Sequence, residues 1–180
     1  MPSEAADDEL ARLAARGDRT AFGALAQRHY DRVHALAWRW SGTRAAAEDI
    51  AQEAMVKMAG AISGFRGDCA FSTWLHRIAY TTAIDHLRAA RRFAPLGPTH
   101  QARLEAEPDG ETPEERQMNG ELWGKVRALP EQQRDAVLLV YAEEMSHREA
   151  AEIMGCSEKT VSWHLHEARK RLRLALEAAQ

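Results

Sequence analysis

Two clusters of basic residues suggest chemistry that involves phosphate groups. One cluster, Arg169 to Arg173, lies at the end of a segment from Ser157 that has the pattern of a helix. Basic side chains late in such a helix can pair with DNA phosphates, while outward side chains near its beginning can contact base edges in the major groove. The candidate DNA contacts on this helix are Ser157, Lys159, Thr160, Ser162, Trp163, His166, Arg169 and Lys170.

The second basic cluster, which contains Arg88, Arg91 and Arg92, ends a segment that is rich in aromatic residues. Opening a duplex requires aromatic side chains that replace lost base stacking, and cations that hold the strand backbone. Most of these aromatic residues are expected in the core, and Tyr80 with the Thr81-Thr82 pair is the preferred contact region. The candidate contacts with melted DNA are Arg77, Tyr80, Thr81, Thr82, His86, Arg88, Arg91 and Arg92.

An acidic face is predicted on an earlier helix that begins after Thr43. Its members are Glu48, Asp49, Gln52 and Glu53, and we expect no matching basic face on the same helix. Such a face suits a basic partner surface. An ordinary solvated helix face is the alternative, and these residues by themselves favour it.

The elements around the last basic cluster predict a helix-turn-helix. Ser146 and Glu149 form a capping box for a short helix that ends at Gly155, and Ser157 caps the next helix. A buried stripe is expected at Val161, Leu165, Ala168 and Leu172. The alternative is that the two amphipathic helices merely pack together.

Helical spacing of apolar residues recurs along the chain, which predicts an all-α fold. The stretch 93–112 is rich in proline, glycine and acidic residues, which is typical of a flexible linker. We therefore predict two small helical domains, residues 1–92 and 113–180, joined by an acidic linker. The formal net charge of −3 conceals a segregation in which the acidic excess lies near this linker.

Several function classes are disfavoured by what the sequence lacks. We find neither a secretion signal nor a membrane-spanning run, which favours a cytoplasmic location, and no catalytic or cofactor-binding motif. His164 and His166 are two residues apart, so on a helix they point in different directions and cannot share a metal ion. We therefore expect no enzymatic activity, no cofactor and no metal site.

Three blocks of sequence in the same order resemble extracytoplasmic-function sigma factors over nearly the whole chain. The blocks are Ala47 to Ala54, Phe65 to Arg88, and Leu129 to Arg173. The resemblance implies that the acidic face binds the β and β′ subunits of core RNA polymerase. It also implies that the Arg77 to Arg92 candidates contact the minus-ten promoter element, and that the Ser157 to Lys170 candidates contact the minus-thirty-five element.

The same resemblance implies a control partner and a path for the linker. Members of this family are kept silent by an anti-sigma factor, either cytoplasmic or membrane-anchored, and their connector threads through the polymerase near the new transcript. This chain departs from the family at Thr81, where an Asn is common at the expected loop-to-helix junction that receives a flipped base. The bulky Trp163 and the few basic residues around it put the usual minus-thirty-five preference in doubt.

Two other functions remain open from the sequence. A sigma-like decoy would occupy an anti-sigma factor without binding promoters, but decoys of that kind carry an additional α/β domain for which this chain has no room. An ordinary activator would bind DNA through the helix-turn-helix without polymerase, which leaves the block from Phe65 to Arg92 unexplained.

Overall fold

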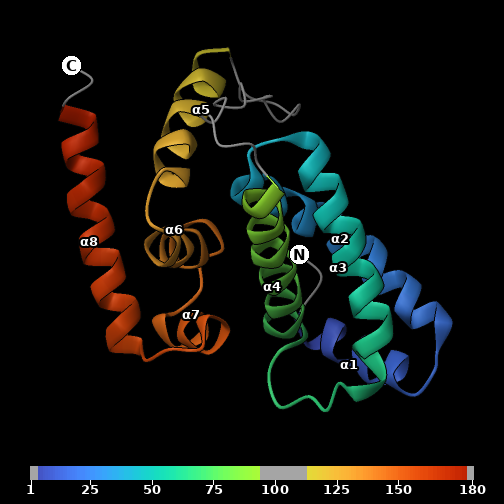
Figure 1. Ribbon diagram of the computed structural model, residues 1–180. Coiled ribbons are helices and arrows are strands. Elements are labelled where there is room, and N and C mark those ends of the chain that lie inside the picture. Colours follow the sequence, from blue (N-terminus) through green and yellow to red (C-terminus); the bar gives the residue numbers. More distant parts are fainter. Residues whose placement is uncertain (1–3, 94–112, 178–180) are drawn as a thin grey trace. The chain divides into compact units, whose positions relative to one another are not determined.

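The computed structural model describes residues 4–93 and 113–177, and in these ranges the chain forms helices and no strand (Figure 1). The predicted all-α fold class is therefore confirmed. The chain divides into two compact units, one with helices α1 to α4 and one with helices α5 to α8. The expected linker, residues 93–112, lies outside the described residues except for Phe93, which is the last residue of α4.

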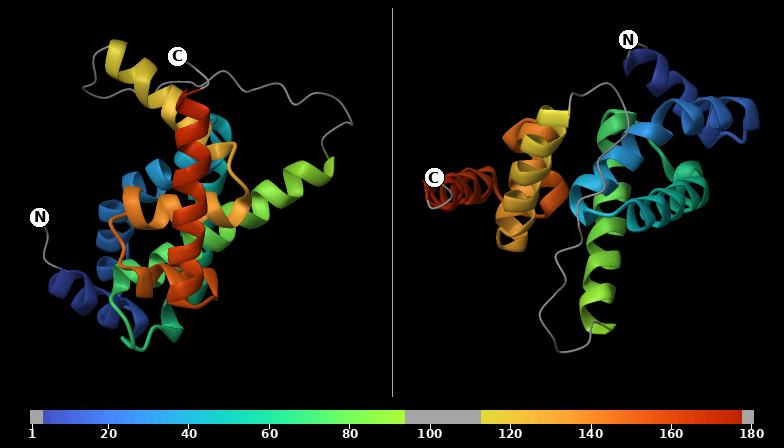
Figure 2. Two further views of the ribbon diagram at one scale, coloured as in Figure 1. Left: turned by 90° about the vertical axis from the view of Figure 1, so that its left-hand side faces the viewer. Right: turned by 90° about the horizontal axis from the view of Figure 1, so that it is seen from above.

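The first unit is a helical bundle. Its elements are α1 (Glu4–Ala15), α2 (Arg19–Ser41), α3 (Arg44–Ala61), the short 3-10 helix η1 (Ile62–Gly64) and α4 (Phe71–Phe93). Helix α2 packs along α3, and α4 packs against both (Figures 1 and 2). Helix α1 contacts α2, α4 and η1, so it joins the beginning of the unit to its end.

Local capping residues set the ends of α2 and α3. The Asp18 carboxylate accepts the backbone N–H groups of Thr20 and Ala21, so Asp18 caps α2. Gly42 ends this helix in the left-handed conformation, with φ of 77°, which glycine adopts without steric cost. Thr43 then caps α3, as predicted.

Large apolar side chains fill the centre of the first unit. Trp40, Ile50, Met58, Phe71 and Leu75 are all at most 2% exposed. Burial of each such side chain contributes roughly 1.5–3 kcal/mol. These contacts fix which faces of α3 and α4 are turned outward.

The second unit ends in the predicted helix-turn-helix. Its elements are α5 (Pro113–Arg127), α6 (Glu131–Val137), η2 (Leu138–Ala142), α7 (His147–Met154) and α8 (Glu158–Glu177). Helix α8 packs against α5, α6 and α7. The chain after α6 does not continue as a regular α-helix, because η2 is a π-helical turn in which the Glu143 N–H bonds to the Leu138 carbonyl.

None of the helices in the described part of the chain is long and apolar enough to cross a membrane.

Candidate functional site

The helix-turn-helix is fixed by two caps and a glycine turn. Ser146 and Glu149 form the reciprocal capping box at the start of α7, and Gly155 ends that helix with φ of 66°. The Ser157 hydroxyl accepts the Thr160 N–H at 3.1 Å and so caps α8. All of these local predictions are confirmed, and they fix the angle at which α8 leaves the turn.

Helix α8 has a buried side and an open side. Val161, Leu165 and Ala168 are at most 1% exposed, which confirms most of the predicted stripe, although Leu172 is only half-buried. The opposite side is open to solvent and includes Trp163, which is 56% exposed. Its exposed members are Lys159, Trp163, His166 and Lys170. A rigid helix with this open face has the properties required of a major-groove reader.

Two side chains that the sequence analysis missed hold candidate DNA contacts in place. The Tyr141 hydroxyl accepts hydrogen bonds from the guanidinium of Arg169, which also lies 5.7 Å from the centre of the Tyr141 ring. His147 Nδ1 is hydrogen-bonded to the Ser162 hydroxyl at 3.0 Å. Neither partner has a sequence signal, because Tyr141 lies 28 residues before Arg169 and His147 lies in the preceding helix.

The two histidines of α8 occupy different environments. His166 is exposed, whereas His164 is half-buried, and burial lowers the pKa of His164 despite the nearby charge of Asp135, which raises it. Within residues 4–93 and 113–177, no three His, Cys, Asp or Glu side chains form a group that could hold a metal ion. The chemistry of this surface is therefore that of hydrogen bonds, aromatic contacts and charge.

Helix α4 presents a partly cationic strip. Arg77, Thr81, Arg88 and Arg92 are exposed, and their spacing of 4, 7 and 4 residues places them on one side of the helix. Asp85 is also exposed and borders this strip. His86 is half-buried, and the side chain of Arg91 lies outside the described residues.

Two of the expected contacts on α4 are buried in the first unit. Tyr80 is 8% exposed and packs edge-to-face against Trp40, with ring centroids 5.9 Å apart. Thr82 is fully buried, and its hydroxyl donates to the Ile78 carbonyl at 2.8 Å. Both side chains therefore serve the core of the first unit, and their contact with DNA stays a prediction.

The position of Thr81 is corrected. The sequence analysis placed it at a loop-to-helix junction, but Thr81 lies inside the continuous helix α4, and its hydroxyl bonds to the carbonyls of Arg77 and Ile78. The junction between loop and helix falls instead at Ala70 and Phe71.

The acidic face of α3 differs from the prediction in its pairing. Asp49, Gln52 and Glu53 are exposed and Glu48 is half-buried. Contrary to expectation, two basic residues of the same helix balance part of this face. Arg44 pairs with Glu48, and Lys57 pairs with Glu53, each at 2.9 Å and four residues apart. Asp49 and Gln52 lie between these two ion pairs.

An apolar groove adjoins the acidic face. It runs between α2 and α3, where Gln52 lies beside Tyr30, Met55 and Val56. Val56 is 71% exposed, so it presents an apolar side chain to solvent at this groove. The sequence analysis missed this groove, although Val56 stands outside the buried stripe of α3 and is a signal that a helical projection could have found.

Comparison with known families matches both units of the chain. The family described as Sigma-70 region 2 matches residues 25–93, and that described as Sigma-70, region 4 matches residues 120–172. The first match contains the faces of α3 and α4, and the second contains the helix-turn-helix.

Individual relatives match along almost the entire length. The RNA polymerase sigma-H factor of Pseudomonas aeruginosa is 34% identical, over 98% of this chain and 97% of its own length. The ECF RNA polymerase sigma factor SigW of Bacillus subtilis is 33% identical, over 89% of this chain and 91% of its own. Among solved structures, CnrH in complex with the cytosolic domain of CnrY is similar with a TM-score of 0.74 and 25% identity, covering 97% of this chain and 99% of that one.

Proposed function

Because the chain belongs to the sigma-70 family and, within it, to the extracytoplasmic-function RNA polymerase sigma factors, we propose that it binds core RNA polymerase and directs transcription to a specific set of promoters. The observation that carries this proposal is the open face of α8, whose polar, basic and aromatic side chains lie on a capped helix inside the matched region 4. This face reads the minus-thirty-five element.

Three exposed side chains of α8 have different roles in binding the minus-thirty-five element. Lys159, near the start of the helix, lies closest to the base edges, where a lysine pairs with guanine. Trp163 offers an apolar surface to thymine methyl groups. Lys170, three turns further on, neutralises a phosphate and fixes the register of the helix on the duplex.

The exposed strip of α4 holds the melted minus-ten element. Arg77, Arg88 and Arg92 supply cations along about four turns of helix, and Thr81 supplies a hydroxyl between them. With Tyr80 in the core, contact with the separated strand depends on charge and hydrogen bonding more than on aromatic stacking.

Core polymerase binds the acidic face of α3. Asp49 and Gln52 are the central contacts, because the carboxylates of Glu48 and Glu53 are already partly neutralised by their own helix. The groove beside Gln52 gives this face an apolar border, so a partner there gains both apolar burial and charge complementarity.

An anti-sigma factor keeps the chain inactive by covering these faces. This part of the proposal is supported by the family and by the similarity to the co-crystal structure of the sigma factor RpoE with the anti-sigma factor NepR from Bartonella quintana, which at 22% identity concerns the fold. The chain acts in the compartment that holds the chromosome, and we assign it no catalytic step.

Transcription in vitro tests the proposed function. The purified chain is mixed with bacterial core polymerase and genomic fragments, and we expect RNA with defined start sites that core polymerase without the chain does not make. In a parallel pull-down, the triple variant D49A/Q52A/E53A should lose core polymerase. The control variant E121A/E152A makes the same change in net charge on exposed residues of the other unit and should retain it. Equal recovery of polymerase by the wild type and the triple variant would refute the assignment of α3.

Upstream contacts are tested separately. The variant K159A/W163A should still bind core polymerase but lose protection of the upstream promoter element in a footprint. An unchanged upstream footprint would contradict the role assigned to α8.

A further inference from the structure

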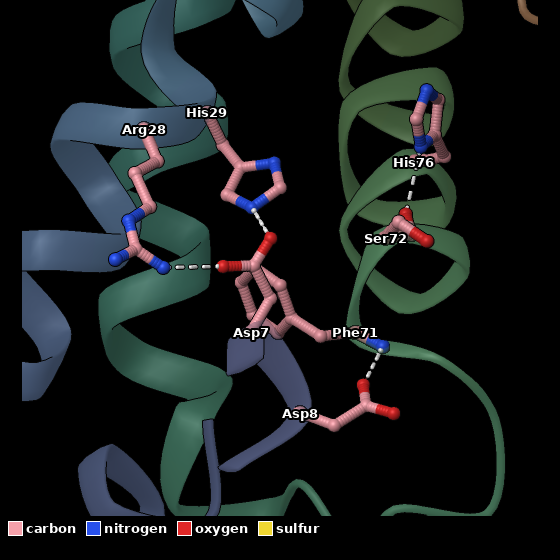
Figure 3. Close-up of polar contacts among 7 residues, drawn as sticks. All are labelled: Asp7, Asp8, Arg28, His29, Phe71, Ser72 and His76. Carbon is pink, nitrogen blue, oxygen red and sulfur yellow. Dashed lines mark hydrogen bonds and ion pairs between the residues drawn. The ribbon is translucent and has the colours of Figure 1, made fainter. Parts of the chain in front are cut away.

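Two consecutive carboxylates of α1 bind two different helices (Figure 3). Asp7 is 8% exposed and receives hydrogen bonds from His29 Nε2 and Arg28 Nη1 of α2, both at 2.9 Å. Asp8 accepts the backbone N–H of Phe71, the first residue of α4, at 2.7 Å. Helix α1 thus connects the start of α4 to the middle of α2.

The contact made by Asp8 is a helix cap supplied from far away in the chain. The first N–H groups of a helix have no partner within it, and a side chain just before the helix usually accepts one of them. Ser72 does not supply this cap, because α4 already begins at Phe71, and the Ser72 carbonyl accepts the Nδ1–H of His76. The acceptor for Phe71 lies 63 residues earlier.

The side chain of Phe71 also holds the start of α4 in place. Its ring is fully buried and lies 5.2 Å from the ring of His29, centre to centre, and 6.0 Å from that of Phe65. His29 therefore contacts Asp7 on one side and Phe71 on the other. The backbone and the ring of the first residue of α4 are both held by groups that α1 and α2 supply.

The junction held in this way precedes the exposed strip of α4. Arg77 lies less than two turns after Phe71, and the loop from Arg66 to Ala70 leads directly into the helix. Gly67 in this loop has φ of 77°, and Arg66 and Asp68 form an exposed ion pair at 3.4 Å. An exposed ion pair contributes little to stability, so the pair of Arg66 with Asp68 does not by itself fix the position of the loop.

We propose that Asp8 is a positioning residue for promoter opening, because its carboxylate holds the first turn of α4 and the preceding loop, while Asp7 ties α1 to α2. This inference rests on the proposed role of α4 in binding the melted minus-ten element. Loss of a helix cap shifts the equilibrium of the helix end by roughly two- to thirtyfold. Opening should fall by a similar factor, whereas binding to polymerase through α3 should not change.

Three variants of the full chain test the proposal. D8A removes the acceptor, and D8N removes the charge but keeps a carbonyl oxygen that can accept the Phe71 N–H. E9A is the matched control, because Glu9 is an exposed neighbour that pairs with Arg12 of the same helix at 3.2 Å. Each variant is combined with core polymerase, and unpaired thymines near the start site are detected by their reactivity with permanganate.

The expected result is a two- to thirtyfold loss of open complexes for D8A, at unchanged affinity for core polymerase. D8N should restore most of the opening, and E9A should behave as the wild type. Opening by D8A at the wild-type level would overturn the proposal. An equal loss in D8A and D8N would also overturn it, because the charge and not the acceptor would then matter.

Hydrogen exchange of the Phe71 amide gives a readout that does not require promoters. The Phe71 amide should exchange two- to thirtyfold faster in D8A than in the wild type, and its exchange in E9A should not change. If the wild-type chain opened no promoter at all, the proposed function would fail, and the contact of Asp8 would be judged by this exchange rate. Unchanged exchange in D8A would overturn the inference by itself.

Discussion

The phenol ring of Tyr80 packs edge-to-face against the indole of Trp40, and both side chains are at least 92% buried. The pair joins α4 to the end of α2 beneath the exposed strip that we assign to the minus-ten element. One residue further, Thr81 is exposed. Neighbouring residues of α4 therefore have different roles, one in the core and one at the surface. Single mutations can test the two roles separately.

Tyr80→Ala should lower the free energy of unfolding by about 3 kcal/mol, which is at the low end for truncation of a buried aromatic side chain. Thr81→Ala should change it by less than about 0.5 kcal/mol but reduce promoter opening. Urea unfolding followed by circular dichroism measures the first effect, and permanganate reactivity measures the second. A Tyr80→Ala variant of wild-type stability that fails to open promoters would restore Tyr80 as a DNA contact.

Acid should destabilise the first unit through His29. Burial lowers the pKa of His29 below its ordinary value of 6.5; the hydrogen bond and charge of Asp7 oppose this, and the charges of Arg32 and His76 reinforce it. Since the unfolded chain takes up a proton near pH 6.5 and the folded chain does so only at lower pH, stability should fall as the pH decreases below 6.5. The loss should level off below the pKa of the folded state.

The matched variant for this effect is His29→Gln, which retains an N–H donor for Asp7 but does not titrate. Unfolding by urea between pH 7.5 and 5 should show a steeper loss of stability for the wild type than for the variant. The pKa of His164 is also lowered by burial, so it acts in the same direction in both proteins and cancels in the comparison. Parallel curves for the two proteins would show that His29 does not contribute.

Arg169 should bind DNA through its charge, and Tyr141 should strengthen this binding by holding the Arg169 side chain in position. If Arg169 neutralises one phosphate, Arg169→Ala reduces the salt dependence of holoenzyme binding by about 0.9 in the slope of log K against log salt. Tyr141→Phe keeps the ring but removes the hydroxyl, so it should weaken binding severalfold, by about 1 kcal/mol, with the slope unchanged. Tighter binding by Tyr141→Phe would show instead that Tyr141 withholds Arg169 from DNA.

The two serine caps of the helix-turn-helix should differ in their effects. Ser146→Ala removes the capping box of α7 and should cost about 1 kcal/mol of stability, with normal DNA binding once the chain is folded. Ser157→Ala removes the cap of α8 and should cost a similar amount while also weakening upstream binding, because Ser157 lies at the end of α8 that we assign to the base edges. Thermal unfolding and upstream footprints measure both effects. Equal losses of binding in the two variants would contradict the assignment of Ser157.

Much of the fold could be predicted from the sequence because the responsible interactions are local. The Thr43 cap, the helix end at Gly155 and the Ser146 capping box each depend on residues within about four positions. The ion pair of Arg44 with Glu48 is equally local, and the spacing of four residues is a signal for it that the sequence contains. The open face of α8 also follows from helical periodicity, since the buried stripe determines which side is left.

Other features depended on contacts between distant segments. The sequence placed Tyr80 and the Thr81-Thr82 pair in one expected contact region, but only the packing of the other helices against α4 showed that Tyr80 and Thr82 are buried while Thr81 is exposed. Likewise, the cap that Asp8 supplies to Phe71 requires two residues far apart in sequence to meet, and a pattern of neighbouring residues carries no information about such a meeting. The sequence by itself therefore determined the helices, their caps and their outward faces, because these arise from interactions within a few residues. The tertiary structure decided which polar side chains serve the core and which remain available to a partner, because burial depends on the elements that pack from elsewhere in the chain.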